Sequence, residues 1–394
     1  MPQTKPTALI IGAGFTGIAT AYDLAMRGFQ VDVLERGELG SGTSGRTHGL
    51  LHSGARYCVH DQEAAVECVA ENAILRKIAR QCIEGNSGYF IAVNESDLAF
   101  AESFTRGAEQ CSLPIAEVPP AELLTVEPML SPQLLRAFRV NDGTFDPLRL
   151  AYAFAASARQ HGARFYPYCE VEELLLDQSR RVVGASVWNR VTDQRQQYQA
   201  DVLINTAGVW AGRIAAMAGI ELPVKPVPGV MVAVEKRLCQ NTINRLNEPG
   251  DGDIILPQRR MVVIGTTSFD AVDVDYIPII REQVEQMVDQ GSEMIPAIRQ
   301  TAHRGVFMSS RPLIKASGDA RNLARTCKVY DHEKSDGVGG FFSLIGGKAT
   351  TCRAMAEKIS DMVSARFGID AACQTARIEL ESYRKFFQFG TEQA

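Results

Sequence analysis

Short apolar runs and amphipathic stretches alternate along the chain, and this pattern predicts an α/β fold. Near the N-terminus an apolar run at 8–11 precedes a helical stretch that ends at Gly28, and a second apolar run follows at 31–34. The segments QADVLINTAG and RMVVIGTTS contain apolar runs and are expected to form buried strands. The segment DPLRLAYAFAASARQHG has an apolar face with helical period and ends at Gly162, which predicts a helix.

A glycine-rich turn joins the first predicted strand to the first predicted helix. Its sequence is GAGFTG, residues 12–17, and the second strand ends at Glu35. Strand, glycine turn, helix and strand within about thirty residues are the context that the dinucleotide-binding fingerprint requires. Gly12 permits the tight turn, Gly14 lets the backbone approach a pyrophosphate, and Gly17 lets the helix lie close to the strand. The helix N-terminus offers N–H groups to phosphate, and Glu35 is expected to bind a ribose hydroxyl.

Three later segments decide between NAD and FAD, because Glu35 followed by Arg36 fits either cofactor. Residues 40–57 are dense in Gly, Ser and Thr, which supply N–H and hydroxyl donors to a diphosphate. Residues 200–212 and 340–359 each lead a predicted strand into a turn of small residues. Three such turns around one ligand favour FAD. The predicted cofactor contacts are Gly12, Gly14, Gly17, Glu35, Arg36, Thr43, Ser44, Thr47, His48, Gly49, Leu50, Val171, Ala207, Gly208, Gly346, Gly347, Lys348 and Thr350.

Composition favours small-molecule chemistry over nucleic-acid binding. The chain of 394 residues is 45% hydrophobic and 22% charged, which is enough apolar material for a large core. Its net charge is -5 and it has no concentrated Lys/Arg face, so a nucleic-acid partner is not expected. The 9 cysteines are scattered without a CxxC pair, a pattern that predicts neither a disulfide framework nor a metal site. We expect a reducing compartment.

The ends of the chain bear on its location. The N-terminal apolar run is too short for a signal peptide or a membrane span, so we expect a cytoplasmic protein with no transmembrane segment. The C-terminal tail, 376–394, mixes aromatic and basic residues. A docked helix is the favoured interpretation of this tail, and peripheral contact with the inner face of the membrane is the alternative.

Several longer strings resemble the FAD-dependent glycerol-3-phosphate dehydrogenases, most closely the anaerobic catalytic-subunit type, within the D-amino-acid oxidase and glycine oxidase superfamily. They are GRTHGLLHSGARY, DGTFDPLRL, INTAGVW, VVIGTTS, SSRPLI and IGGKATTCR, and they extend from residue 45 to 353. The resemblance implies a Rossmann-like FAD-binding domain interleaved with an α+β substrate domain. The FAD-binding domain would comprise 1–90, 145–215 and 330–375, and the substrate domain 90–145 and 215–330.

The same resemblance implies a reaction and its residues. The expected reaction is the oxidation of a secondary alcohol, sn-glycerol 3-phosphate to dihydroxyacetone phosphate, by hydride transfer to non-covalently bound FAD. It implies that Arg311 lies near the reacting carbon, that Lys348 and Arg325 hold the phosphate, and that Arg56 and Tyr57 close the pocket. Arginine suits this task because its planar fork can bind two anionic oxygens at once.

Two of these assignments stay open at the level of sequence. His52 is the candidate proton acceptor because histidine ordinarily titrates near neutral pH, but the superfamily also uses this position to pack against or covalently hold the flavin. Lys348 could bind the phosphate or stand near the flavin pyrimidine carbonyl, where the following helix N-terminus adds positive potential. Arg321 rivals Arg325 as the second phosphate ligand.

Other functions compete with this hypothesis. A 2-hydroxy-acid oxidase of the L-2-hydroxyglutarate type, or an amino-acid oxidase, would use the same FAD segments, with Arg311 binding a carboxylate. A catalytically silent flavin-binding subunit is the alternative from another class. The number of cations around the pocket separates phosphate from carboxylate substrates. Only Cys373 follows the last flavin segment, so we expect electrons to pass to a quinone, to oxygen or to a partner subunit rather than to an iron–sulfur module of this chain.

Overall fold

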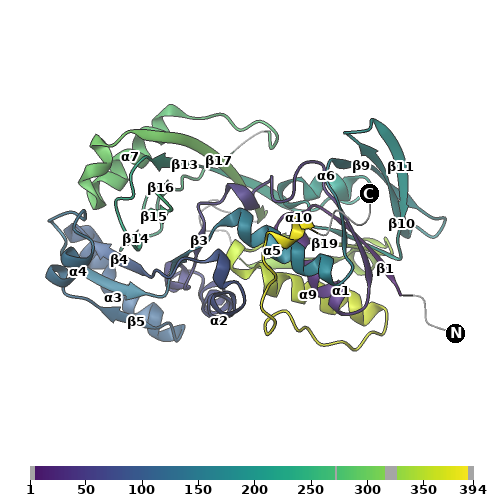
Figure 1. Cartoon of the computed structure of the whole chain (residues 1–394), viewed down its shortest axis with the longest axis horizontal. Helices are drawn as coiled ribbons and strands as arrows, with labels where there is room; N and C mark the ends of the chain where they lie inside the picture. Colours follow the sequence, from purple (N-terminus) through teal and green to yellow (C-terminus); the bar gives the residue numbers. More distant parts are fainter. Residues whose placement is uncertain (1–4, 271–272, 316–325, 389–394) are drawn as a thin grey trace.

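The computed structural model describes residues 5–270, 273–315 and 326–388. Figure 1 shows two lobes along the longest axis of the molecule. One lobe contains β1 (Thr7–Ile11) with α1 (Phe15–Met26), and the other contains β13 (Val224–Val234) with α7 (Arg281–Met294). Chain segments pass between the lobes several times, so each lobe is assembled from parts that are distant in sequence.

A six-stranded sheet forms the centre of the first lobe. In spatial order its strands are β18 (Cys327–Asp331), β19 (Phe341–Gly346), β12 (Val202–Asn205), β1, β2 (Gln30–Leu34) and β8 (Arg164–Tyr166). All neighbours pair in parallel except β18 with β19. Parallel strands are covered on both faces, which is why β1 and β12 consist almost entirely of buried apolar residues.

Helices cover one face of this sheet and a small antiparallel sheet covers the other. The helices α1, α5 (Pro147–Gln160) and α9 (Cys352–Arg366) bury their apolar faces together with alternate residues of β1 and β2. The opposite residues of β1 and β12 pack against the strands β9 (Cys169–Leu176) and β10 (Val182–Asn189) and the helix α6 (Ala211–Ala216). The strand β11 (Gln194–Gln199) completes the small sheet.

An eight-stranded sheet forms the second lobe. In spatial order its strands are β17 (His303–Ile314), β13, β16 (Met261–Gly265), β15 (Ile254–Gln258), β14 (Thr242–Arg245), β4 (Gly88–Ala92), β6 (Arg136–Val140) and β5 (Ile115–Glu117). The helices of this lobe are α3 (Glu95–Gln110), α4 (Pro120–Val126) and α7. Between the lobes lie the helix α2 (Gln62–Ile78) and the paired short strands β3 (Leu50–Leu51) and β7 (Gly143–Thr144).

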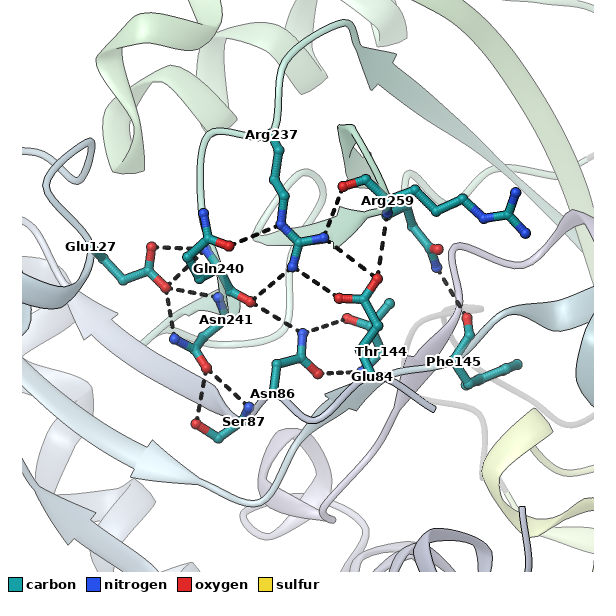
Figure 2. A network of polar contacts seen from close by, with 11 residues as sticks. Glu84, Asn86, Ser87, Glu127, Thr144, Phe145, Arg237, Gln240, Asn241 and Arg259 are labelled. Atoms are coloured by element: carbon teal, nitrogen blue, oxygen red, sulfur yellow. Dashed lines mark hydrogen bonds and ion pairs between the residues drawn. The ribbon is translucent and has the colours of Figure 1, made fainter. Parts of the chain in front are cut away.

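A polar network near this junction ties together segments that are far apart in sequence (Figure 2). Arg237 lies at its centre: its Nη2 donates to the carboxylate of Glu84 at 2.9 Å, and its Nη1 donates to the carbonyl oxygen of Arg259 at 2.9 Å. The side chain of Asn86 bonds both the backbone N–H and the hydroxyl of Thr144. These bonds hold the connections that enter the eight-stranded sheet.

The predicted elements are confirmed where the sequence signal was strong. The runs at 8–11 and 31–34 lie in β1 and β2, and the helix between them ends at Met26, just before Gly28 at φ +95°. The two predicted buried strands are β12 and β16, and the periodic segment after residue 145 is α5. The boundaries expected for the two domains stay a prediction.

The described part of the C-terminal tail is docked on the first lobe. The helix α10 (Lys385–Gln388) lies beside α5, where Arg159 donates to the carbonyl oxygen of Phe386 at 2.7 Å. The Arg159 guanidinium also stands 3.9 Å from the centre of the Phe386 ring, which is itself buried. The short helix α8 (His332–Asp336) follows β18. No helix in the described ranges has the length and hydropathy that crossing a membrane requires.

Candidate active site

A cavity of about 1430 Å³ opens where the two lobes meet. Its first wall is made by the carboxyl ends of β1, β2, β12 and β19, the edge at which parallel α/β sheets bind ligands. Its second wall is made by β13, β17 and the residues that follow β16. Pockets for small ligands usually enclose about 300–1,000 Å³, so this cavity has room for a dinucleotide together with a substrate.

The glycine turn on the first wall leaves no room for side chains. Gly12 has φ +98°, and a Cβ on it would lie 2.8 Å from the carbonyl oxygen of Thr206. A Cβ on Gly17 would lie 1.9 Å from the carbonyl oxygen of Gly12, because α1 crosses the end of β1 at close range. Gly14 caps α1 and lines the cavity beside Ser44, whose Oγ accepts a hydrogen bond from the N–H of Phe15. The start of the helix is therefore open to an anion.

Glu35 stands at the end of β2 and lines the cavity. Its Oε2 accepts a hydrogen bond from the N–H of Ala13 at 2.8 Å, and its Oε1 accepts one from the N–H of Gly37 at 2.9 Å. These bonds fix the direction of the carboxylate, and each oxygen has a second lone pair for a ribose hydroxyl. The bare approach at Gly14, the helix N-terminus and this carboxylate fit the pyrophosphate and ribose of FAD.

The rim near Glu35 is closed by a cluster that the sequence did not reveal. Asp275 accepts hydrogen bonds from Trp210 Nε1 at 2.7 Å, from Arg36 at 3.1 Å and from Arg213. Burial alone would raise the pKa of Asp275, but the bonds from Arg213, Trp210 and Arg36 outweigh it and lower the pKa to about 2. The Arg36 guanidinium also lies 4.2 Å from the centre of the Trp210 ring. Arg36, expected to bind the cofactor, is thus engaged with other side chains at the rim.

Most of the remaining predicted cofactor residues line the cavity, and three do not. Those at the cavity wall are Thr43, Ser44, Thr47, His48, Leu50, Val171, Ala207, Gly208, Gly346, Gly347 and Lys348. Gly17, Gly49 and Thr350 lie behind the cavity wall, and their contribution to cofactor binding stays a prediction. Gly17 packs α1 on β1. Gly49 is enclosed by Gln258 and the carbonyl of Phe145, and Thr350 accepts a hydrogen bond from the N–H of His52.

Arg311 lies on the second wall, in β17, where three backbone carbonyl oxygens accept hydrogen bonds from it. Its Nη2 donates to the carbonyl oxygen of Thr267 at 2.8 Å and to that of Pro228 at 3.4 Å, and its Nε donates to that of Val227 at 3.3 Å. Carbonyl groups are neutral dipoles, so these bonds orient the guanidinium without cancelling its charge. A cation aimed in this way suits a developing negative charge on a substrate oxygen.

His52, Tyr57 and Lys348 form a second group on the cavity wall. The Tyr57 hydroxyl lies 3.4 Å from Nε2 of His52, and the Lys348 ammonium lies 5.1 Å from the centre of the Tyr57 ring. Behind Lys348, Glu67 on α2 places Oε2 at 4.0 Å from Nζ, a contact that the sequence did not signal. Burial raises the pKa of Glu67, and the charge of Lys348 opposes that rise. The Lys348 side chain is only 6% exposed.

Arg56 forms an ion pair that the sequence did not signal. Its Nη2 donates to both carboxylate oxygens of Asp253 at 2.9 Å and to the carbonyl oxygen of Gly250 at 3.3 Å. The Asp253 side chain is 1% exposed, so this is a buried ion pair that holds the loop at the mouth of the cavity. Arg56 lines the cavity and its charge is matched by Asp253, while its role in closing the pocket stays a prediction. Arg325 and its rival Arg321 lie outside the described residues.

Comparison with known proteins agrees with this geometry. The chain matches the family described as FAD dependent oxidoreductase over residues 7–361. It is 38% identical to the A1 chain of the anaerobic glycerol-3-phosphate dehydrogenase of Haloferax volcanii over 387 residues, which are 95% of this chain and 66% of that protein. It is 38% identical to the corresponding chain of the Escherichia coli anaerobic enzyme over 376 residues, which are 94% of this chain and 69% of that protein. The chain thus spans about two thirds of the length of these relatives.

Solved structures show the same fold at low sequence identity. Glycine oxidase from Geobacillus kaustophilus matches with a TM-score of 0.75 and 21% identity, covering 96% of this chain and 99% of that one. Glycerol-3-phosphate dehydrogenase from Bacillus halodurans, complexed with FAD, matches with a TM-score of 0.73 and 23% identity, covering 99% of this chain and 71% of that one. The chain therefore belongs to the FAD-dependent oxidoreductase family, and FAD is its cofactor.

Proposed function

We propose that this protein oxidises sn-glycerol 3-phosphate to dihydroxyacetone phosphate. One observation carries the proposal: Arg311, His52 and Lys348, from three distant segments, line the same cavity as the FAD-binding glycine turn. Oxidation of a phosphorylated secondary alcohol needs an oriented cation, a proton acceptor and a phosphate ligand, and these residues provide one of each. The relatives at 38% identity are named as subunits of anaerobic glycerol-3-phosphate dehydrogenases, which supports this substrate over a 2-hydroxy acid or an amino acid.

In this proposal bound FAD supplies the acceptor for the hydride that leaves the substrate carbon. His52 takes the hydroxyl proton, and the Tyr57 hydroxyl at 3.4 Å from its Nε2 helps to orient the ring. Arg311, held by the carbonyl oxygens of Thr267, Pro228 and Val227, stabilises negative charge on the substrate oxygen as that proton leaves. The role of Arg311 therefore grows as the reaction proceeds.

Lys348 is the cation that we assign to the phosphate among the described residues. Its ammonium is held over the Tyr57 ring and near Glu67, so it enters the site from a defined direction. Arg56 is paired with Asp253, so we do not assign it to the phosphate. We retain Arg325 as the second phosphate ligand on the strength of the sequence alone. Two cations besides Arg311 would then face a dianionic group.

We further propose that the electrons pass from the flavin to a separate acceptor. The relatives are named as parts of larger enzymes, which supports electron transfer to a partner subunit. A quinone and oxygen are the alternatives carried over from the sequence. The cytoplasmic location stays a prediction.

Anaerobic reduction of the purified yellow protein tests the substrate. The protein is mixed without oxygen with sn-glycerol 3-phosphate, other phosphorylated alcohols, 2-hydroxy acids and amino acids, and bleaching of the flavin absorption band is followed. We expect fast bleaching with sn-glycerol 3-phosphate and little with the unphosphorylated compounds. Faster bleaching by a 2-hydroxy acid or an amino acid would overturn the proposal in favour of that class. No bleaching by any compound, with flavin that dithionite still reduces, would favour a silent flavin-binding subunit.

A further inference from the structure

His48 lies on the cavity wall in a backbone that is fixed on both sides. Its carbonyl oxygen accepts a hydrogen bond from Nε2 of Gln258 at 2.8 Å, and the same nitrogen donates to the carbonyl of Phe145 at 3.1 Å. The next residues enter β3, where Leu50 pairs with Thr144 of β7. The His48 residue is 9% exposed. Its ring therefore has little freedom to turn away from the cavity that it lines.

One hydrogen bond decides which ring nitrogen of His48 carries the proton. Nδ1 accepts a hydrogen bond from the backbone N–H of Leu50 at 3.1 Å. A nitrogen that accepts a hydrogen bond has no proton, so the neutral ring must hold its proton on Nε2. Nε2 has no protein partner among the described residues, and it is not sealed from the cavity. His48 thus directs an N–H group with an unmet hydrogen bond towards the ligands of the cavity.

Burial and two nearby cations keep the His48 ring neutral. Burial lowers the pKa of His48 to about 3, and the cations Arg56 and Arg311 lower it in the same direction. The ring of His52 lies nearby, with 6.5 Å between the ring centroids. A ring that stays neutral and whose second nitrogen is already bonded cannot take a proton from the substrate. It can only donate.

The ring faces the second wall of the cavity, where the substrate is expected. A Cβ built on Gly265 would lie 3.4 Å from Cδ2 of His48, so the ring edge rests on the end of β16. Gly265 pairs with Met231 of β13, which also lines the cavity. The carbonyl of Thr267, two residues beyond Gly265, is the one that orients Arg311. His48 and Arg311 therefore serve the same end of the cavity.

We propose that His48 is a further catalytic residue, whose Nε2–H donates a hydrogen bond to an oxygen at the reacting end of the cavity, either a carbonyl of FAD or the reacting oxygen of the substrate. A fixed neutral donor costs no proton transfer and needs no reorganisation, which is the property of groups that stabilise developing oxyanions. His48 and His52 then divide the work: the first donates a hydrogen bond and the second accepts a proton. A hydrogen bond from His48 to the substrate rests on the proposed function, whereas a hydrogen bond from His48 to FAD does not.

Two amide variants separate the two ring nitrogens. In His48→Asn the amide oxygen can still accept the Leu50 N–H in place of Nδ1, but nothing reaches the position of Nε2. In His48→Gln the longer side chain can bring an N–H to that position. The FAD dissociation constant, the flavin midpoint potential and the limiting rate of flavin reduction are measured for both variants and for the wild type.

The quantity that changes in His48→Asn identifies the group that accepts the hydrogen bond from His48. If His48 bonds the flavin, His48→Asn should favour the oxidised form at least tenfold, a fall of about 30 mV in the two-electron potential, and His48→Gln should restore much of it. If it bonds the substrate, the potential stays unchanged and the limiting reduction rate falls tenfold or more, again with partial recovery in His48→Gln. A His48→Asn protein with wild-type potential, FAD affinity and reduction rate would overturn the proposal.

NMR of the wild-type holoenzyme with nitrogen-labelled histidine tests the same proposal without a variant. We expect the His48 ring to show a proton on Nε2 and to stay neutral between about pH 5 and 9. A His48 signal that titrates near neutral pH, or that carries its proton on Nδ1, would overturn the assignment. The spectrum and the potential are read whether or not sn-glycerol 3-phosphate is the substrate, so a failure of the proposed function is recognised separately.

Discussion

The two walls of the cavity present polar groups in different ways. The first wall uses backbone N–H groups at the start of α1, beside Gly14, which has no side chain. The second wall uses a side chain, Arg311, oriented by three carbonyl oxygens. The first arrangement requires empty space beside the backbone, and the second requires a positive charge with a fixed orientation. Added atoms should therefore harm the first wall, and a change of donor geometry should harm the second.

Gly14→Val should abolish FAD binding at the first wall. The new side chain would fill the space at the cavity face of Gly14, where the pyrophosphate must approach the helix N-terminus, so we expect loss of FAD binding. Flavin content of the purified protein measures this, with circular dichroism to establish that the variant folds. Gly85→Val is the control, because a Cβ at Gly85 meets no atom within 4 Å. Full flavin occupancy in folded Gly14→Val would refute the assignment of this turn.

Acid precipitation should release all of the flavin. The first wall offers FAD hydrogen-bond donors and a helix N-terminus, and no cysteine directly precedes the turn at Gly346 and Gly347. Non-covalent binding of FAD therefore stays a prediction, and it rests on the sequence. Absorption of the supernatant and of the dissolved pellet is the measurement. A yellow pellet would point to covalent attachment, for which His52 is the first residue to examine by peptide mapping.

Arg311→Lys should show that the second wall needs a donor of fixed orientation. The charge is retained, but the planar fork that bonds three carbonyls is lost, so we expect the limiting rate of flavin reduction to fall about 10²-fold. Stopped-flow reduction at saturating substrate measures it. Arg304→Lys, on the same strand and exposed beside Glu235, should keep the wild-type rate. An unchanged limiting rate with a higher substrate requirement would make Arg311 a binding residue only.

Asp275→Asn should have the smallest effect and a defined pH dependence. The variant weakens the rim cluster with Arg36, Trp210 and Arg213, and exposed ion pairs contribute little, so we expect FAD affinity to fall about two- to fivefold at neutral pH. The pKa of Asp275 is lowered to about 2, so the contribution of its charge is present above the ordinary carboxyl pKa and is lost as the pH falls towards 2.

Fluorescence titration of FAD into the apoprotein across that pH range measures the effect of Asp275→Asn. The wild type and the variant should converge in acid. Asp270→Asn, in the same connection but paired with Lys225, is the matched control and should bind FAD like the wild type. If the two variants weaken FAD binding equally at neutral pH, the rim cluster has no specific role in holding the cofactor.

The roles predicted for single residues divide by how far apart in the sequence the interacting residues lie. The glycine turn, the strand ends and Glu35 were all recognisable because they lie within one short stretch of chain. The pairing of Arg56 with Asp253 and of Lys348 with Glu67 joins residues from distant segments, and no local pattern announces it. The sequence therefore predicted the presence of these cations at the pocket but not which of them are matched by a carboxylate.

The amino-acid sequence by itself determined the α/β class, the dinucleotide turn and the strands and helices that carry it, because backbone sterics and hydrophobic period act over neighbouring residues. The tertiary structure decided the electrostatics of the site. Whether Arg36 meets a cofactor or Asp275 depends on what the folded chain brings beside it, and the same holds for the ring nitrogen on which His48 keeps its proton. Burial and charge pairing act between segments that meet only when the chain has folded, and they set which groups can carry a charge.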